Sequence, residues 1–173
     1  MSNLPSFHDP ETGLPNRSAI SVLLADVLVR DDDVAVLFFG IERLARVAEV
    51  HGAEASADVV RAVASRIRGS LPVSATLGRI DDVLVALVPG ENAAFSRILA
   101  RQAIERVREP MFVAGQQLGP TINVGIVRRL PVDRVDRLLR DAGLALRHAQ
   151  QRGGGRIALF EDLPPGLFGG EPG

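Results

Sequence analysis

The feature that most constrains this chain is a short segment near its start, Asp9-Pro10-Glu11-Thr12-Gly13-Leu14-Pro15-Asn16-Arg17. Gly13 and Pro15 mark a turn, and Asn16 tolerates the unusual backbone angles that turns require. A helical pattern follows at once, from about Arg17 to Arg30. Its apolar residues are spaced to lie on one face: Ile20, Leu23, Leu24, Val27 and Leu28. A tight turn that leads directly into an amphipathic helix is therefore expected to open the domain.

Composition excludes several classes of protein. At 173 residues, with 46% hydrophobic and 24% charged residues, the chain is expected to form one domain with a proper core. The net charge of −1 gives no reason to expect nucleic acid as a partner. No apolar run approaches the roughly 20 residues of a membrane-spanning helix, so no membrane insertion is expected. The absence of cysteine excludes disulfides and thiolate metal sites, and it suits a cytoplasmic protein.

Helices and strands alternate in the first half of the chain. The continuous apolar run over 34–39 predicts a buried central strand. A long helical pattern then covers about 42–68, with a break near Gly52. Two strand-like segments, 75–80 and 83–88, flank Asp81-Asp82, which predicts a hairpin with a tight turn.

The second half continues this alternation. A helix is expected over 93–108, strands at 111–113 and 118–127, a helix over 132–151 and a short strand at 156–160. Gly153-Gly154-Gly155 predicts the end of the last helix. Residues 161–173 are rich in proline and glycine and read as a flexible tail after a domain of residues 1–160. The order of elements predicts an α+β fold with a central mixed, mostly antiparallel sheet covered by helices.

The opening segment resembles the start of GGDEF domains, the fold that makes cyclic di-GMP. Asp9, Gly13, Leu14, Asn16 and Arg17 carry the resemblance, together with the helix that follows. The last helix and its exit are consistent with the same family: Leu138-Leu139, Ala142, Ala145-Leu146, Ala149 and Gly153. The resemblance covers about residues 8–160 and implies a nucleotide-cyclase-like palm. Because the family uses its opening motif mainly to fix the fold, Asp9 and Arg17 are expected to pair across the turn.

The family's chemistry joins two GTP molecules held by a dimer, with two divalent metals bound by carboxylates. The position of its first metal aspartate falls on Gly40, which has no side chain that could bind a cation. Glu42 lies two residues on, where many members keep a second acid. The usual phenylalanine-lysine pair, the Gly-His pair and the two guanine contacts fall on Leu44-Ala45, Gly52-Ala53, Ala48 and Ala57.

The family's name-giving signature should lie on the predicted hairpin, where this chain reads Arg79-Ile80-Asp81-Asp82-Val83. No register yields two glycines followed by two acids, and the turn is one residue short, which leaves the register open. Asp81 and Asp82 are either a solvated turn or a residual cation contact. In the last helix the family's aspartate, tyrosine and phosphate-binding lysine fall on Gly143, Arg147 and Gln150. The family's inhibitory Arg-x-x-Asp motif would fall on 70–76, which contains neither residue.

Other candidate features favour simple structural readings. His8, His51 and His148 lie in three different elements and are expected to be isolated surface residues. The glycine run at 153–155, followed by Arg156, could cradle an anion, but a helix stop is the simpler reading. Arginines and aspartates alternate over 128–141, which predicts helical charge pairs on a solvated face.

Two hypotheses about function follow. The first is a catalytically inactive GGDEF-like domain, without cofactor, that acts as a regulatory or protein-interaction module in cyclic di-GMP-related signalling. Its partner would be another protein or domain, a second copy of the chain included. The alternative is a sensor that binds GTP or cyclic di-GMP weakly through altered contacts, for which Glu42, Asp81 and Asp82 are the remaining acidic candidates.

Overall fold

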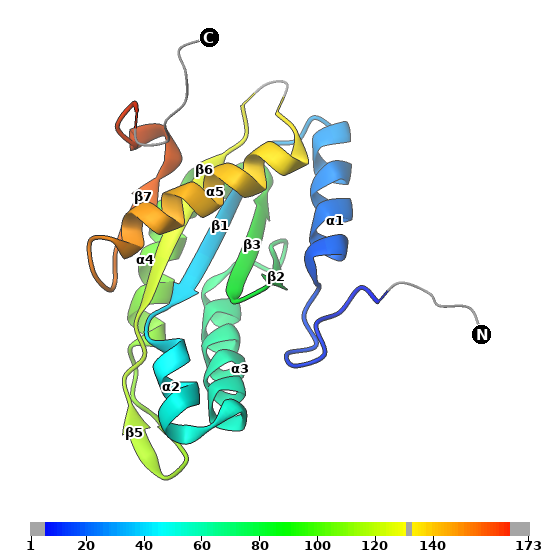
Figure 1. Ribbon diagram of the computed structural model, residues 1–173. Coiled ribbons are helices and arrows are strands. Elements are labelled where there is room, and N and C mark those ends of the chain that lie inside the picture. Colours follow the sequence, from blue (N-terminus) through cyan, green and yellow to red (C-terminus); the bar gives the residue numbers. More distant parts are fainter. Residues whose placement is uncertain (1–5, 131–132, 167–173) are drawn as a thin grey trace, which may run out of the picture.

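A computed structural model describes residues 6–130 and 133–166 (Figure 1). Helices and strands alternate along the chain. Their bounds are α1 (Arg17–Val29), β1 (Val34–Ile41), α2 (Leu44–His51), α3 (Ala53–Ser70), β2 (Thr76–Ile80), β3 (Val83–Pro89), η1 (Gly90–Phe95), α4 (Ser96–Val107), β4 (Met111–Val113), β5 (Gln116–Leu118), β6 (Ile122–Arg128), α5 (Val135–Gln150), β7 (Ile157–Leu159) and η2 (Phe160–Asp162). The predicted break in the long helical pattern at Gly52 is confirmed, because α2 ends and α3 begins there.

The core of the fold is a five-stranded sheet in the order β2-β3-β1-β6-β7. Strand β1 pairs antiparallel with both β3 and β6, and β2 pairs antiparallel with β3. Only β7 runs parallel to its neighbour, β6. The predicted α+β fold with a mixed, mostly antiparallel sheet is confirmed. The hairpin register is also defined, since Ile80 pairs with Val83 and leaves Asp81 and Asp82 as a two-residue turn.

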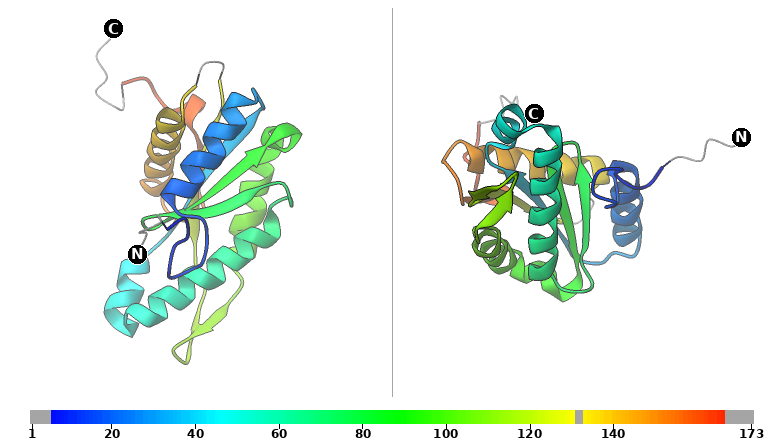
Figure 2. Two further views of the ribbon diagram at one scale, coloured as in Figure 1. Left: turned by 90° about the vertical axis from the view of Figure 1, so that its right-hand side faces the viewer. Right: turned by 90° about the horizontal axis from the view of Figure 1, so that it is seen from below.

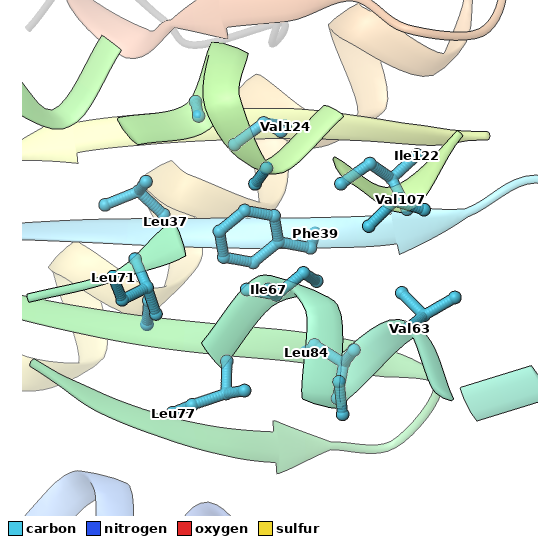
Figure 3. Close-up of a cluster of buried hydrophobic side chains, with 14 of the residues drawn as sticks. Leu37, Phe39, Val63, Ile67, Leu71, Leu77, Leu84, Val107, Ile122 and Val124 are labelled. Carbon is cyan, nitrogen blue, oxygen red and sulfur yellow. The ribbon is translucent and has the colours of Figure 1, made fainter. Parts of the chain in front are cut away.

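Helices cover both faces of this sheet, as the end-on view in Figure 2 shows. On β1 the side chains alternate, as the pleat of a strand requires. Leu37 and Phe39 pack with α3 and α4, and Figure 3 shows Phe39 at the centre of this cluster. Val36 and Phe38 pack with α1 and α5 on the other face. Because β1 is buried on both faces, its sequence is a continuous apolar run.

One predicted strand is wrong. Residues 118–127 do not form a single strand: β5 ends at Leu118, and β6 begins at Ile122. Gly119-Pro120 lies between them, and proline lacks the N–H that a sheet ladder requires. β4 and β5 pair only with each other, in a separate small hairpin. The helix predicted over 93–108 is also modified, because its first residues belong to the 3₁₀ turn η1.

The ends of the domain differ slightly from expectation. Helix α5 begins at Val135 rather than Val132, which lies outside the described residues. The packed chain extends past residue 160, because Leu163 contacts the small cluster of Ala145, Ala149 and Ala158. The division at 160 and the flexibility of the tail remain predictions, and 167–173 lie outside the described residues. Within the described ranges, no helix is long and apolar enough to cross a bilayer.

Candidate functional site

The opening motif folds into a compact loop around the carboxylate of Asp9. Its Oδ2 accepts hydrogen bonds from the backbone N–H of Thr12 at 2.8 Å and from the Thr12 hydroxyl at 2.6 Å. The Asp9 N–H donates to the carbonyl of Leu14, and the Gly13 N–H donates to the carbonyl of Asp9, both at 2.7 Å. Asn16 then caps α1, since its Oδ1 accepts from the Ala19 N–H at 3.1 Å. The predicted turn into a helix is confirmed.

The expected pair between Asp9 and Arg17 is wrong. Asp9 instead pairs with Arg79 of β2 at 3.2 Å, and Arg79 also binds Glu11 at 2.8 Å. Arg17 lies 3.8 Å from Asp81, and both of these side chains are largely exposed. The Arg79 side chain is only 11% exposed, so the loop is held by a cation seventy residues further on. Sequence reasoning missed this pair because nothing local links the two segments.

Backbone contacts join the loop to the hairpin as well. The Arg79 N–H donates to the carbonyl of Pro15 at 2.8 Å, so the loop runs along the outer edge of β2. At Gly78 a Cβ would lie 2.7 Å from that same carbonyl oxygen and 2.5 Å from Cδ1 of Ile20. The loop can approach this closely only because Gly78 has no side chain. The opening loop therefore holds the β2–β3 hairpin close to α1.

The ionic contacts of the loop have a consequence for acid stability. Burial raises the pKa of Asp9, but hydrogen bonds from Thr12 and the contact with Arg79 outweigh it and hold the pKa below its usual value. A depressed carboxyl pKa contributes stability that is complete above the unfolded value of about 3.9 and is lost as pH falls through the folded value.

We predict that the Asp9→Asn variant loses less stability than the wild type between about pH 5 and pH 2.5, because its side chain does not titrate. Urea unfolding at a series of pH values measures this difference. The matched control is Asp58→Asn, which removes an exposed carboxylate that pairs with Arg61. Equal pH slopes for wild type and Asp9→Asn would contradict the assignment.

A hollow of about 520 Å³ lies where β1 ends, between α2, the β2–β3 turn and the end of α5. Gly40, Ala48 and Ala53 face it, together with charged or polar side chains from the loop, the start of α2, α3, the hairpin and α5. These are Glu11, Arg43, Ser56, Arg79, Asp82 and Gln150. The arrangement brings the predicted position Gly40 and the predicted acid Asp82 to one site.

Two side chains of α5 lie close to Gly40. A Cβ at this position would lie 2.6 Å from Nε2 of Gln150 and 3.2 Å from Cδ1 of Leu146. An aspartate here would therefore require α5's side chains to move. Of the two carboxylates in the hollow, Glu11 is bound by Arg79.

Glu42 lies elsewhere. Its Oε1 accepts a hydrogen bond from Nδ2 of Asn123 at 2.9 Å, and its N–H donates to the carbonyl of Thr121. Asn123 is fully buried and also accepts from the N–H of Arg156 at 3.0 Å. Glu42 contributes to a second hollow, and Asp82 to the first. The one polar residue within the apolar run of β6 was the signal that could have revealed this link.

The other charged candidates form structural pairs. The predicted helical pairs are confirmed in part, because Arg137 pairs with Asp133 and with Asp141 at 3.8 Å, each four residues away. Arg128 and Arg129 instead reach back to the segment before β1, where they bind Asp33 at 2.6 Å and Asp31 at 2.7 Å. The arginines of α5 are exposed as expected, but Asp141 is buried. Among the residues that the structure describes, no three His, Asp or Glu side chains lie close enough to hold a metal ion.

Comparisons with known proteins agree with this architecture. The family model described as "Diguanylate cyclase, GGDEF domain" matches residues 6–156. The diguanylate cyclase TpbB of Pseudomonas aeruginosa is 30% identical over 167 residues, covering 91% of this chain and 38% of that protein. The uncharacterized protein y4lL of Sinorhizobium fredii is 31% identical over 160 residues, covering 89% of this chain and 19% of that protein. The chain thus spans well under half the length of these relatives.

Solved structures show the same fold. The isolated GGDEF domain of TpbB has a TM-score of 0.78 at 28% identity, with 88% of this chain and 93% of that chain covered. Diguanylate cyclase SiaD of P. aeruginosa, solved with its activator SiaC, has a TM-score of 0.83 at 20% identity, with 89% and 62% covered. At that identity SiaD supports the fold alone. Fold, opening loop and family match together show that this chain belongs to the GGDEF domain family.

Proposed function

We propose that this chain is a catalytically inactive GGDEF domain that acts as a regulatory or protein-interaction module in cyclic di-GMP signalling. The observation that carries the proposal is the absence of a carboxylate at Gly40. Two-metal chemistry needs several oxygen ligands around each hard cation. A glycine supplies no side-chain ligand here, and the atom nearest to its missing Cβ is the amide nitrogen of Gln150.

The neighbouring acids do not replace the missing ligand. Glu42 faces a different hollow and is hydrogen-bonded to Asn123. Glu11 is bound by Arg79. Asp82 is left as the single carboxylate in the hollow without an ion pair among the described residues. One carboxylate does not hold two metals beside a triphosphate.

The two positions that the family uses to contact guanine carry no polar group. Ala48 faces the hollow, and Ala57 is buried in α3. Alanine side chains donate and accept no hydrogen bonds, so they cannot discriminate between bases. The two faces of the sheet, in contrast, both carry a buried hydrophobic cluster. We therefore propose a folded domain that does not turn over GTP.

The relatives fit a modular role. They include a cyclic di-GMP phosphodiesterase of P. aeruginosa, NbdA, in which the matching region is 20% of the protein. A domain of this kind works beside others in a longer chain. We propose that the partner is a second domain or another protein, which contacts the exposed surface of this domain.

We predict no formation of cyclic di-GMP when the purified chain is incubated with GTP and Mg²⁺. Chromatography of the products measures it, with the diguanylate cyclase TpbB under the same conditions as the assay control. Product formation by the chain would overturn the proposal and would show that metals bind without an acid at Gly40.

A nucleotide sensor remains the second candidate, because the guanidinium-bearing residues Arg43 and Arg79 lie with Asp82 around the same hollow. Calorimetric titration with GTP plus Mg²⁺, and separately with cyclic di-GMP, distinguishes the two. Micromolar binding that Asp82→Asn abolishes would favour the sensor. Asp58→Asn, on the exposed surface of α3, is the matched control.

A further inference from the structure

A second and larger hollow, of about 670 Å³, lies on the opposite side of α2 from Gly40. It is formed by α2, the end of β5, the segment before β6 and the glycine turn after α5. Figure 1 shows α2 beside the small β4–β5 hairpin at one end of the domain. Pockets that hold small molecules are commonly 300–1,000 Å³, so the volume suits a ligand rather than a single ion.

Three arginines line this hollow: Arg43 and Arg46 at the start of α2, and Arg108 directly after α4. None of the three side chains makes a hydrogen bond or ion pair within the described part of the chain. Glu42 is the single acid in the lining, and its carboxylate is already hydrogen-bonded to Asn123. The hollow therefore has an excess of positive charge.

The glycine turn after α5 lies beside the side chain of Arg108. Gly155 has a φ of +73°, and a Cβ there would lie 2.5 Å from Nη2 of Arg108. At Gly154 a Cβ would lie 2.6 Å from Cγ2 of Thr121. Backbone without side chains thus forms this wall, and it allows the end of the Arg108 side chain to approach the turn. The glycine run does more than end the helix.

Part of the lining is apolar. Val47 and Val50 of α2 and Leu118 of β5 contribute it, and Val50 is 62% exposed. An exposed valine beside unpaired guanidinium groups favours a ligand with both an anionic end and an apolar body. The planar guanidinium recognises carboxylate and phosphate oxygens through two parallel hydrogen bonds.

We propose that this hollow is a binding site for a small organic oxyanion, whose charged end contacts Arg46 and Arg108 and whose apolar body covers Val47, Val50 and Leu118. This hollow adjoins the one at Gly40, because Ile41 and Arg43 line both. Arg46 and Arg108, which make the proposed contacts with the anion, line only this one.

Titration of the full chain with phenyl phosphate and with benzoate tests the proposal, followed by ¹H–¹⁵N NMR. For ligands of this size we expect saturable binding with a Kd of about 1 mM or tighter. The amide signals of Gly119 and Gly154, which line the hollow, should shift, and that of Gly69 should not. The tighter of the two probes identifies the anion as a phosphate or a carboxylate, and either result supports the site.

The double variant Arg46→Gln/Arg108→Gln should weaken binding at least tenfold. The matched control is Arg97→Gln/Arg101→Gln, which removes the same charge from exposed positions on α4 and should bind like the wild type. Three results would overturn the proposal: no saturable binding of either probe, unchanged binding by the first variant, or inorganic phosphate binding as tightly as phenyl phosphate.

Discussion

Valine at position 125 is expected to destabilise the domain by at least about 3 kcal/mol. Gly125 lies in β6 directly beneath α5, where a Cβ would be 2.6 Å from the carbonyl oxygen of Ala142 and in still closer conflict with the backbone N of Leu146. Both neighbours are backbone atoms, so no rotamer change relieves the clash. The helix must move away from the sheet, and the contacts of Leu138 and Leu146 with it would be lost.

Urea unfolding followed by circular dichroism measures this effect. The matched control is Gly143→Ala in α5, where a Cβ would meet only ring carbons of Phe38, the nearest at 3.6 Å. That is an ordinary van der Waals distance, and alanine favours a helix over glycine by about 1 kcal/mol. We expect Gly143→Ala to be neutral or stabilising. A Gly125→Val variant as stable as wild type would mean that α5 does not pack this closely on β6.

Replacing Arg79 by methionine is expected to cost about 2 kcal/mol of unfolding free energy. Methionine keeps the length of the side chain but leaves the carboxylates of Asp9 and Glu11 without their cation. The value lies between that of an exposed pair, below about 1 kcal/mol, and that of a fully buried one, because the Asp9 side chain is 20% exposed.

Arg17→Met is the matched control for Arg79→Met. Arg17 is 3.8 Å from Asp81, and its side chain is 63% exposed, so we expect a change within about 0.5 kcal/mol. Urea unfolding at neutral pH compares the two variants. If Arg17→Met were the more destabilising variant, the cation that holds the opening loop would have been wrongly assigned.

The fold was accessible from sequence because its signals are local. The continuous apolar run of β1, the helical spacing of α3 and the two acids between β2 and β3 each reflect residues close together along the chain. The strand predicted over 118–127 was wrong because of one residue. Pro120 interrupts the apolar pattern that joins β5 and β6, since it cannot donate to a sheet ladder.

The site could be predicted only in part. The substitution of the first metal position by Gly40 was visible from the sequence and its family resemblance alone. That Gln150 lies beside Gly40 was not, because α5 reaches β1 only in the folded sheet. The hydrogen bond of Glu42 to Asn123 of β6, and its position in a different hollow from Asp82, are likewise tertiary features.

By itself, the sequence determined the family, the order of elements and the residue types at each position of the signature. Tertiary structure decided which charges meet: Asp9 pairs with Arg79 rather than with Arg17, and Arg108 after α4 lines the same hollow as Arg43 and Arg46 of α2. The physical reason is that periodicity depends on neighbours within a few residues, whereas charge pairs form wherever the sheet brings distant segments together.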